Sequence, residues 1–154
     1  MPIFRFPYDQ KECNQLEKTG PLIPVTVSLP EALAVLRSSE GKHIPAPVRG
    51  MAILDTGAYV SAIDLGVFQH FSIPPIDKVY FNSAGGYAKS EIFPARLSFP
   101  ELNLPKLEME RVIGCNLGWT GRGDDEFLML MGRDILKNFL VVYDGVHSEW
   151  LLGH

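Results

Sequence analysis

One short segment of this chain combines residue types that can do chemistry. Asp55-Thr56-Gly57-Ala58 directly follows the apolar run Met51-Ala52-Ile53-Leu54, and no other Asp-Thr-Gly or Asp-Ser-Gly occurs in the sequence. Glycine supplies the backbone freedom that a tight turn needs, and the threonine hydroxyl can hydrogen-bond. A carboxylate at the end of a buried strand can take part in acid–base chemistry on water. Because water activation by two carboxylates needs a pair, the second would have to come from another copy of this chain.

The same tripeptide also has a plainer interpretation. Asp and Gly both favour turns, so Asp55-Thr56-Gly57 could merely join two strands of a hairpin. The tripeptide alone does not decide between these hypotheses. The elements around it have to decide.

Composition excludes several classes of protein. The 154 residues suffice for one domain with a proper core, and 46% hydrophobic and 21% charged residues are ordinary values for a folded protein. A net charge of −4 and a pI near 5.5 argue against nucleic acid as the main partner. Neither a signal peptide nor a membrane-spanning run is found. We therefore expect no nucleic-acid and no membrane partner, and a cytoplasmic location.

Metal and cofactor chemistry finds no support in the sequence. The two cysteines, Cys13 and Cys115, lack the spacing of metal ligands, and the four histidines are widely separated. We therefore expect no metal and no cofactor.

Hydrophobic periodicity and turn residues predict a mainly β chain. Residues 1–20 are interpreted as an irregular N-terminal arm and residues 21–154 as the folded domain. Ser28 and Glu31 form a capping-box pattern that predicts a helix through Leu36, and Asp64 is expected to cap a second helix. The expected strands span 22–28, 48–54, 59–63, 78–81, 87–93, 95–99, 107–109, 111–116, 127–131, 140–143 and 149–152.

Two further segments with recognisable patterns follow the acidic turn along the chain. Asn82-Ser83-Ala84-Gly85-Gly86 lies between two β-rich stretches, which predicts a hairpin with a glycine-rich tip. Leu128-Met129-Leu130-Met131 is then followed by Gly132-Arg133-Asp134, which is expected to open a short helix.

Together these three segments resemble the retropepsin-like aspartic proteases, the single-lobe relatives of retroviral protease. The resemblance covers about residues 22–152. It implies a mainly β fold, a closed retropepsin-like β-barrel with two or three short helices. It also implies a homodimer that acts on a peptide or protein substrate without a cofactor.

The resemblance assigns a role to each matching residue. Asp55 would be the catalytic aspartate, Thr56 would brace the two turns of a dimer, and Gly57 would let peptide backbone approach. The implied substrate-binding residues are Ala58, Tyr59, Ser83, Ala84, Gly85, Gly86 and Tyr87, most of them in a flexible hairpin, the flap. Gly132, Arg133 and Asp134 would support the active-site turn from behind.

The chain also departs from the viral pattern. Tyr59 stands where retroviral enzymes carry an acidic residue that takes part in substrate recognition. The stretch between the flap and the second motif is longer, and the helix after Ser28 resembles an insertion. These departures point to a cellular or bacterial branch of the family.

The predicted function is an aspartic endopeptidase in which two Asp55 carboxylates activate water. The alternative from another class is a non-catalytic domain of the same fold that dimerises or binds peptides, since a fold does not imply a function. A third hypothesis makes the chain a piece of a larger polypeptide.

Overall fold

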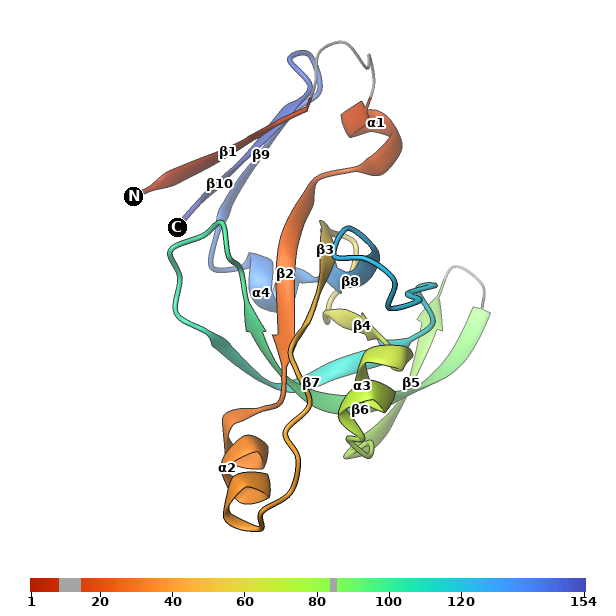
Figure 1. The fold of residues 1–154 in the computed structure, drawn as a ribbon. Helices are drawn as coiled ribbons and strands as arrows, with labels where there is room; N and C mark the ends of the chain where they lie inside the picture. Colours follow the sequence, from red (N-terminus) through yellow and green to blue (C-terminus); the bar gives the residue numbers. More distant parts are fainter. Residues whose placement is uncertain (9–14, 84–85) are drawn as a thin grey trace.

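A computed structural model describes residues 1–8, 15–83 and 86–154 of the chain (Figure 1). Most of these residues lie in strands, with four short helices among the described residues. The helices are α1 (Gln15–Thr19), α2 (Glu31–Ser39), α3 (Leu65–Phe71) and α4 (Arg133–Leu136). The prediction of a mainly β chain is confirmed, and α1 is an additional helix within the predicted arm.

The main sheet closes on itself. Its strands run in the order β2 (Leu22–Ser28), β3 (Val48–Leu54), β8 (Phe127–Met131), β4 (Ala62–Asp64), β7 (Leu107–Cys115), β6 (Gly86–Ser98) and β5 (Asp77–Ser83). An additional pairing of β2 with β6, through Thr26–Ser28, closes the ring from β2 to β6 into a barrel and leaves β5 outside it. The predicted closed barrel is confirmed.

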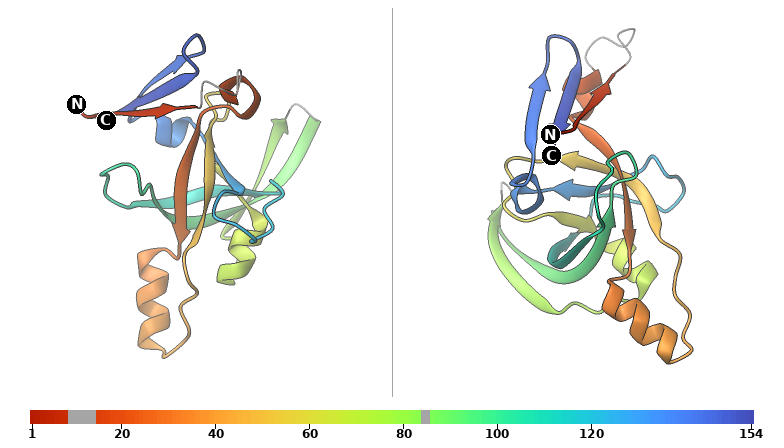
Figure 2. Two further views of the ribbon diagram at one scale, coloured as in Figure 1. Left: turned by 45° about the horizontal axis from the view of Figure 1, so that its top comes forward. Right: turned by 90° about the vertical axis from the view of Figure 1, so that its left-hand side faces the viewer.

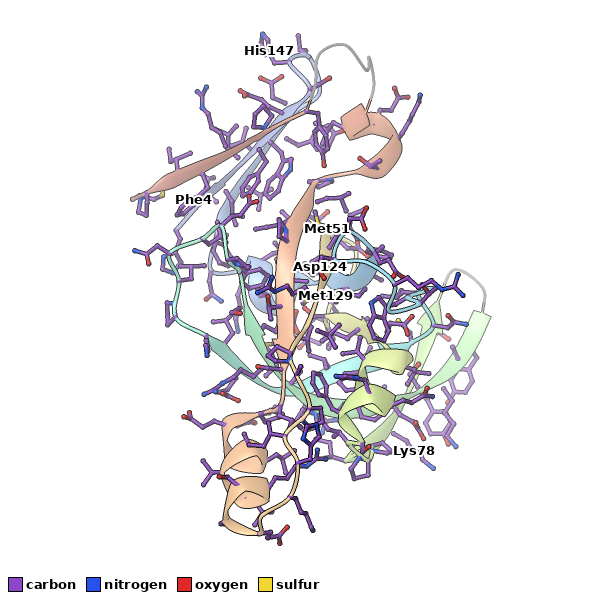
Figure 3. The ribbon with its side chains drawn as sticks, viewed as in Figure 1. Phe4, Met51, Lys78, Asp124, Met129 and His147 are labelled. Atoms are coloured by element: carbon purple, nitrogen blue, oxygen red, sulfur yellow. The ribbon has the colours of Figure 1, made fainter. Side chains whose placement is uncertain are left out.

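The interior of the barrel is apolar because alternate residues of every strand point into it. Ile23, Ile63 and Met129 are all fully buried, and Met129 lies near the middle of the molecule in Figure 3. β3 is central as predicted, since it pairs with β2 on one side and with β8 on the other. This central strand ends where Asp55 begins, so the acidic turn stands on a rigid support.

A second, three-stranded sheet lies at one end of the barrel, and α2 projects at the opposite end (Figure 2). The sheet consists of β1 (Ile3–Pro7), β10 (Glu149–Gly153) and β9 (Leu140–Asp144), in that order. The prediction of an irregular segment is wrong for residues 3–7. β1 forms because Phe6 stacks on the buried Trp150 of β10, with their ring centroids 4.1 Å apart.

Three further local predictions need correction. Ser28 does not cap α2, which begins at Glu31 without a side-chain cap, because Ser28 pairs with Arg96 as the last residue of β2. The strand expected over 59–63 is confined to β4, Ala62–Asp64. The strands expected on either side of Pro94 form one continuous β6, with a register shift between Phe93 and Ala95, and β7 likewise runs unbroken.

Candidate active site

The Asp55 carboxylate is held by its own turn. The backbone N–H of Asp55 donates to the carbonyl of Met131 at 2.9 Å, which fixes the turn to the neighbouring strand. The N–H groups of Gly57 and Ala58 donate to Asp55 Oδ1 at 2.8 and 3.2 Å. Within the described part of the chain, Oδ2 has no hydrogen-bond partner. The half-buried carboxylate therefore has one fixed oxygen and one available oxygen.

Gly57 leaves room for this arrangement. A Cβ added at Gly57 would lie 3.1 Å from Asp55 Oδ1, which is tighter than an ordinary contact. Thr56 is exposed on the turn, and its carbonyl accepts a hydrogen bond from Arg133 Nη1 at 2.9 Å. The predicted bracing role of the Thr56 hydroxyl would require a second copy of the chain.

The segment from Gly132 to Asp134 lies directly behind the turn. The backbone N–H of Arg133 donates to the carbonyl of Ala58 at 2.9 Å, in addition to the contact of its side chain with Thr56. A Cβ at Gly132 would lie 2.8 Å from the carbonyl carbon of Val60, so only glycine fits against this backbone. The structure thus brings together the two motifs that the sequence analysis linked.

Ser61 joins these two segments and was missed by the sequence analysis. It is fully buried, and its Oγ donates to Asp134 Oδ1 at 2.6 Å and accepts from the N–H of Gly132 at 2.9 Å. The N–H of Ser61 also donates to both carboxylate oxygens of Asp134, at 3.1 and 3.0 Å. The available signal was one hydroxyl residue in an otherwise apolar run.

An apolar strip adjoins the carboxylate on the outside of the barrel. Ile53 pairs with Leu130, Leu130 with Ala62, and Ala62 with Ile113, so these side chains form one row across neighbouring strands. Ile53 is the last residue but one of β3, and Asp55 directly follows that strand. Ile53, Leu130 and Ile113 are only partly buried. The sequence analysis missed this apolar strip because its register is set by non-local pairing.

The predicted flap is a long hairpin of β5 and β6, paired from Asp77–Ile92 to Ser83–Gly86. Ala84 and Gly85 lie outside the described residues, whereas Gly86 has a φ of 107°, a conformation that suits glycine. Tyr87 is 75% exposed and stacks on Tyr80, with ring centroids 5.8 Å apart.

Strand alternation places Tyr87 and Tyr80 on the flap face opposite to Ile92, which belongs to the row of the apolar strip. Tyr59 is 77% exposed, directly after the turn.

Two carboxylates outside the predicted set fix the loop that connects β7 to β8. Asp64 is only 5% exposed; its Oδ1 accepts from the N–H of Gly66, and its Oδ2 accepts from Leu117 N at 2.6 Å and Trp119 N at 3.3 Å. Asp64 therefore caps α3 as predicted and also holds the loop start.

Glu126 holds the other end of this loop through hydrogen bonds from backbone N–H groups of Thr120, Arg122 and Gly123. The hydrogen bonds, led by that from Thr120, lower the pKa of Glu126 to about 2.

Within residues 1–8, 15–83 and 86–154, no three His, Cys, Asp or Glu side chains are grouped so as to hold a metal ion. In the same part of the chain, no helix is long and apolar enough to cross a lipid bilayer.

Comparison with known proteins gives similarity in fold. No protein-family model and no curated protein sequence matches the chain. Solved structures that resemble it over most of its length include an EIAV protease in complex with the inhibitor HBY-793, with 16% identity, 77% of this chain and 86% of that chain covered, and a TM-score of 0.44.

The protease of simian foamy virus (mac) is similar with 10% identity, 76% and 92% coverage, and a TM-score of 0.44. A retropepsin-like aspartic protease from Rickettsia conorii is similar with 13% identity, 86% and 91% coverage, and a TM-score of 0.42. These likenesses concern the fold alone, so any activity has to be argued from Asp55 and its surroundings.

Proposed function

We propose that this chain is an aspartic endopeptidase that works as a homodimer, with one Asp55 from each copy in the catalytic pair. The proposal rests on the hydrogen bonding of the Asp55 carboxylate. Its Oδ1 receives two backbone N–H groups at a turn anchored by Arg133, while its Oδ2 has no partner among the described residues. An oriented carboxylate with one available oxygen suits proton transfer to and from a bound water.

The chemistry requires two such carboxylates. Like charges a few ångströms apart repel strongly in a poorly solvated site, so the two Asp55 side chains would share one proton. The ionised member removes a proton from water, whose oxygen attacks the scissile carbonyl carbon. The neutral member donates a hydrogen bond to the carbonyl oxygen as negative charge develops there.

The apolar strip and the flap support a peptide substrate. Partly exposed Ile53, Leu130 and Ile113 offer an apolar floor beside Asp55. The flap strands would close over an extended peptide and exclude water, a strand-like mode of recognition. We therefore expect a preference for apolar side chains next to the cleaved bond.

The three-stranded sheet is the surface that we assign to the second copy. Its strand β9 follows α4, whose first residue, Arg133, binds the active-site turn, so β9 lies close to that turn along the chain. Its outward face carries Ile3, Leu140 and Val142, which are 55%, 51% and 42% exposed, and its outer strands β1 and β9 each have a free edge among the described strands. A cytoplasmic location remains part of this proposal.

The test is peptide-library cleavage followed by mass spectrometry, at about pH 3 to 8, with wild-type protein and the Asp55→Asn variant. The amide of Asn can still accept the hydrogen bonds from Gly57 and Ala58, but it cannot take a proton from water. We expect cleavage by the wild type and a loss of about 10²–10⁴-fold or more in the variant, with unchanged sedimentation and thermal stability. Peptide binding without cleavage by the wild type would instead favour the non-catalytic hypothesis.

A further inference from the structure

The flap has a second face that points away from the apolar strip. Lys78 pairs with Glu91, and Tyr80 pairs with Lys89. Because side chains alternate along a strand, these residues and Tyr87 share one face, opposite to that of Ile92. We call this set the outer flap face: Lys78, Tyr80, Tyr87, Lys89 and Glu91. Figure 3 shows Lys78 at the root of the hairpin.

A cavity of about 440 Å³ lies at the root of the outer flap face. It is lined by Lys78, Lys89 and Glu91 of the flap and by Leu65, Gly114 and Asn116 of the barrel. Gly114 pairs with Glu91, and a Cβ at Gly114 would lie 2.6 Å from Leu65 Cδ2, so Leu65 stands on the same side of the sheet as the outer flap face. Most of the cavity lining therefore lies on the face opposite to the apolar strip, and Ser90 and Cys115, which alternate to the side of the strip, complete it.

The charge and the aromatic surface around the cavity indicate what it would bind. Two lysines face one carboxylate, and neither lysine has an ion-pair partner among the described residues. The Lys89 ammonium lies 5.7 Å from the centroid of the Tyr80 ring. Tyr80 and Tyr87 form a stacked pair and are 55% and 75% exposed. Exposed aromatic rings beside unpaired cations are typical of binding surfaces rather than of a solvated strand pair.

We propose that the outer flap face and its cavity bind an acidic peptide segment that carries one large apolar side chain. Carboxylates would bind Lys78 and Lys89, and the apolar side chain would enter the cavity against Leu65, which together with Phe93 covers Gly114. Such a ligand would join the flap to the barrel. This binding does not require Asp55 to be catalytic.

The test is a titration of the isotope-labelled Asp55→Asn protein, followed by amide chemical shifts, so that turnover cannot consume the probe. The probes are acetyl-Glu-Glu-Phe-Glu-Glu-amide and its neutral counterpart acetyl-Gln-Gln-Phe-Gln-Gln-amide. We expect saturable shifts at Lys78, Lys89 and Gly114 with the acidic probe, and binding about tenfold weaker with the neutral probe. The affinity for the acidic probe should also fall as salt is added.

A charge-reversed variant localises the effect. Lys78→Glu combined with Lys89→Glu should weaken binding of the acidic probe about tenfold or more, whereas Lys106→Glu, an exposed lysine between β6 and β7, should leave it unchanged. Equal affinity for the two probes, shifts centred on the Asp55 turn, or no binding of the acidic probe would each overturn the proposal. None of these outcomes bears on the cleavage assay, which measures Asp55 separately.

Discussion

Ser61 shows how one side chain links the two halves of the candidate active site. Its hydroxyl donates to Asp134 and accepts from the N–H of Gly132, while Arg133, between those two residues, binds the carbonyls of Thr56 and Ala58. The position of the Asp55 turn therefore depends on a hydrogen-bond network that never touches the carboxylate itself. Buried networks of this kind hold a site rigid only while every member is satisfied.

Replacing Ser61 with Ala should destabilise the protein by about 1–3 kcal/mol, because Asp134 loses a donor and the Gly132 N–H loses its acceptor in a buried place. Chemical denaturation measures this free energy of unfolding. The matched control is Ser39→Ala at the exposed end of α2, where the hydroxyl donates only to the nearby carbonyl of Leu36. Equal free energies of unfolding for the two variants would contradict the role given to Ser61.

Residue types alone predicted some members of this network and not others. Gly57, Gly132 and Arg133 could be placed from motif order, and the structure brings them to the Asp55 turn. The Ser61–Asp134 contact joins residues 73 positions apart, and no local pattern fixes such a pairing. The tertiary fold determines which groups pair with a buried polar side chain. The sequence therefore predicted Gly132, Arg133 and Asp134 but not Ser61.

At the scale of elements, prediction succeeded where periodicity and turn chemistry agreed. The apolar run of β3 and the Asp64 cap of α3 were both placed close to their observed positions. Prediction failed where pairing with a strand remote in the sequence determined the local structure. Ser28, for example, was expected to cap α2 but pairs with Arg96 of β6 and so belongs to β2. β1 forms from the mostly apolar segment Ile3–Pro7 because this segment pairs with the remote strand β10.

The stability of the loop between β7 and β8 should depend on pH, because Glu126 holds this loop. Glu126 accepts backbone hydrogen bonds that lower its pKa from 4.5 to about 2. Since the folded-state pKa is depressed, the carboxylate stabilises the loop above about pH 4.5, and that contribution is lost as the pH falls toward 2. Hydrogen exchange of the Thr120, Arg122 and Gly123 amides should therefore lose protection over this range.

Glu126→Gln should weaken the same protection at neutral pH, because a neutral amide is a poorer acceptor than a carboxylate. The matched control is Glu101→Gln, an exposed residue in the turn after β6 with no hydrogen bond to another described residue. Protection of the three loop amides that stays constant from neutral pH to about pH 2, or that survives Glu126→Gln, would exclude Glu126 as the anchor of the loop.

At the scale of the whole molecule, the barrel and the three-stranded sheet have different tasks. The barrel buries its own interior and presents the Asp55 turn at the end of its central strand β3. The sheet buries Trp150 and partly buries Phe6 on one side but leaves Ile3, Leu140 and Val142 exposed on the other. A three-stranded sheet with exposed apolar side chains and free edges is suited to contact with another protein chain. The proposed catalytic pair requires a second copy of this chain.

A charge introduced on that outward face should therefore dissociate the proposed dimer and, as a consequence, abolish peptide cleavage. Val142→Glu places a carboxylate on the outward face, which the proposed dimer would bury, so we expect the dimer dissociation constant to rise about 10²-fold or more. Val146→Glu is the matched control, since Val146 is 88% exposed at the tip of the same β9–β10 hairpin. Sedimentation and peptide cleavage are measured over a dilution series. We expect Val142→Glu to lose the dimer and the cleavage activity in parallel, and Val146→Glu to keep both. Full activity of a Val142→Glu monomer would show that one Asp55 is enough, which the shared-proton mechanism forbids.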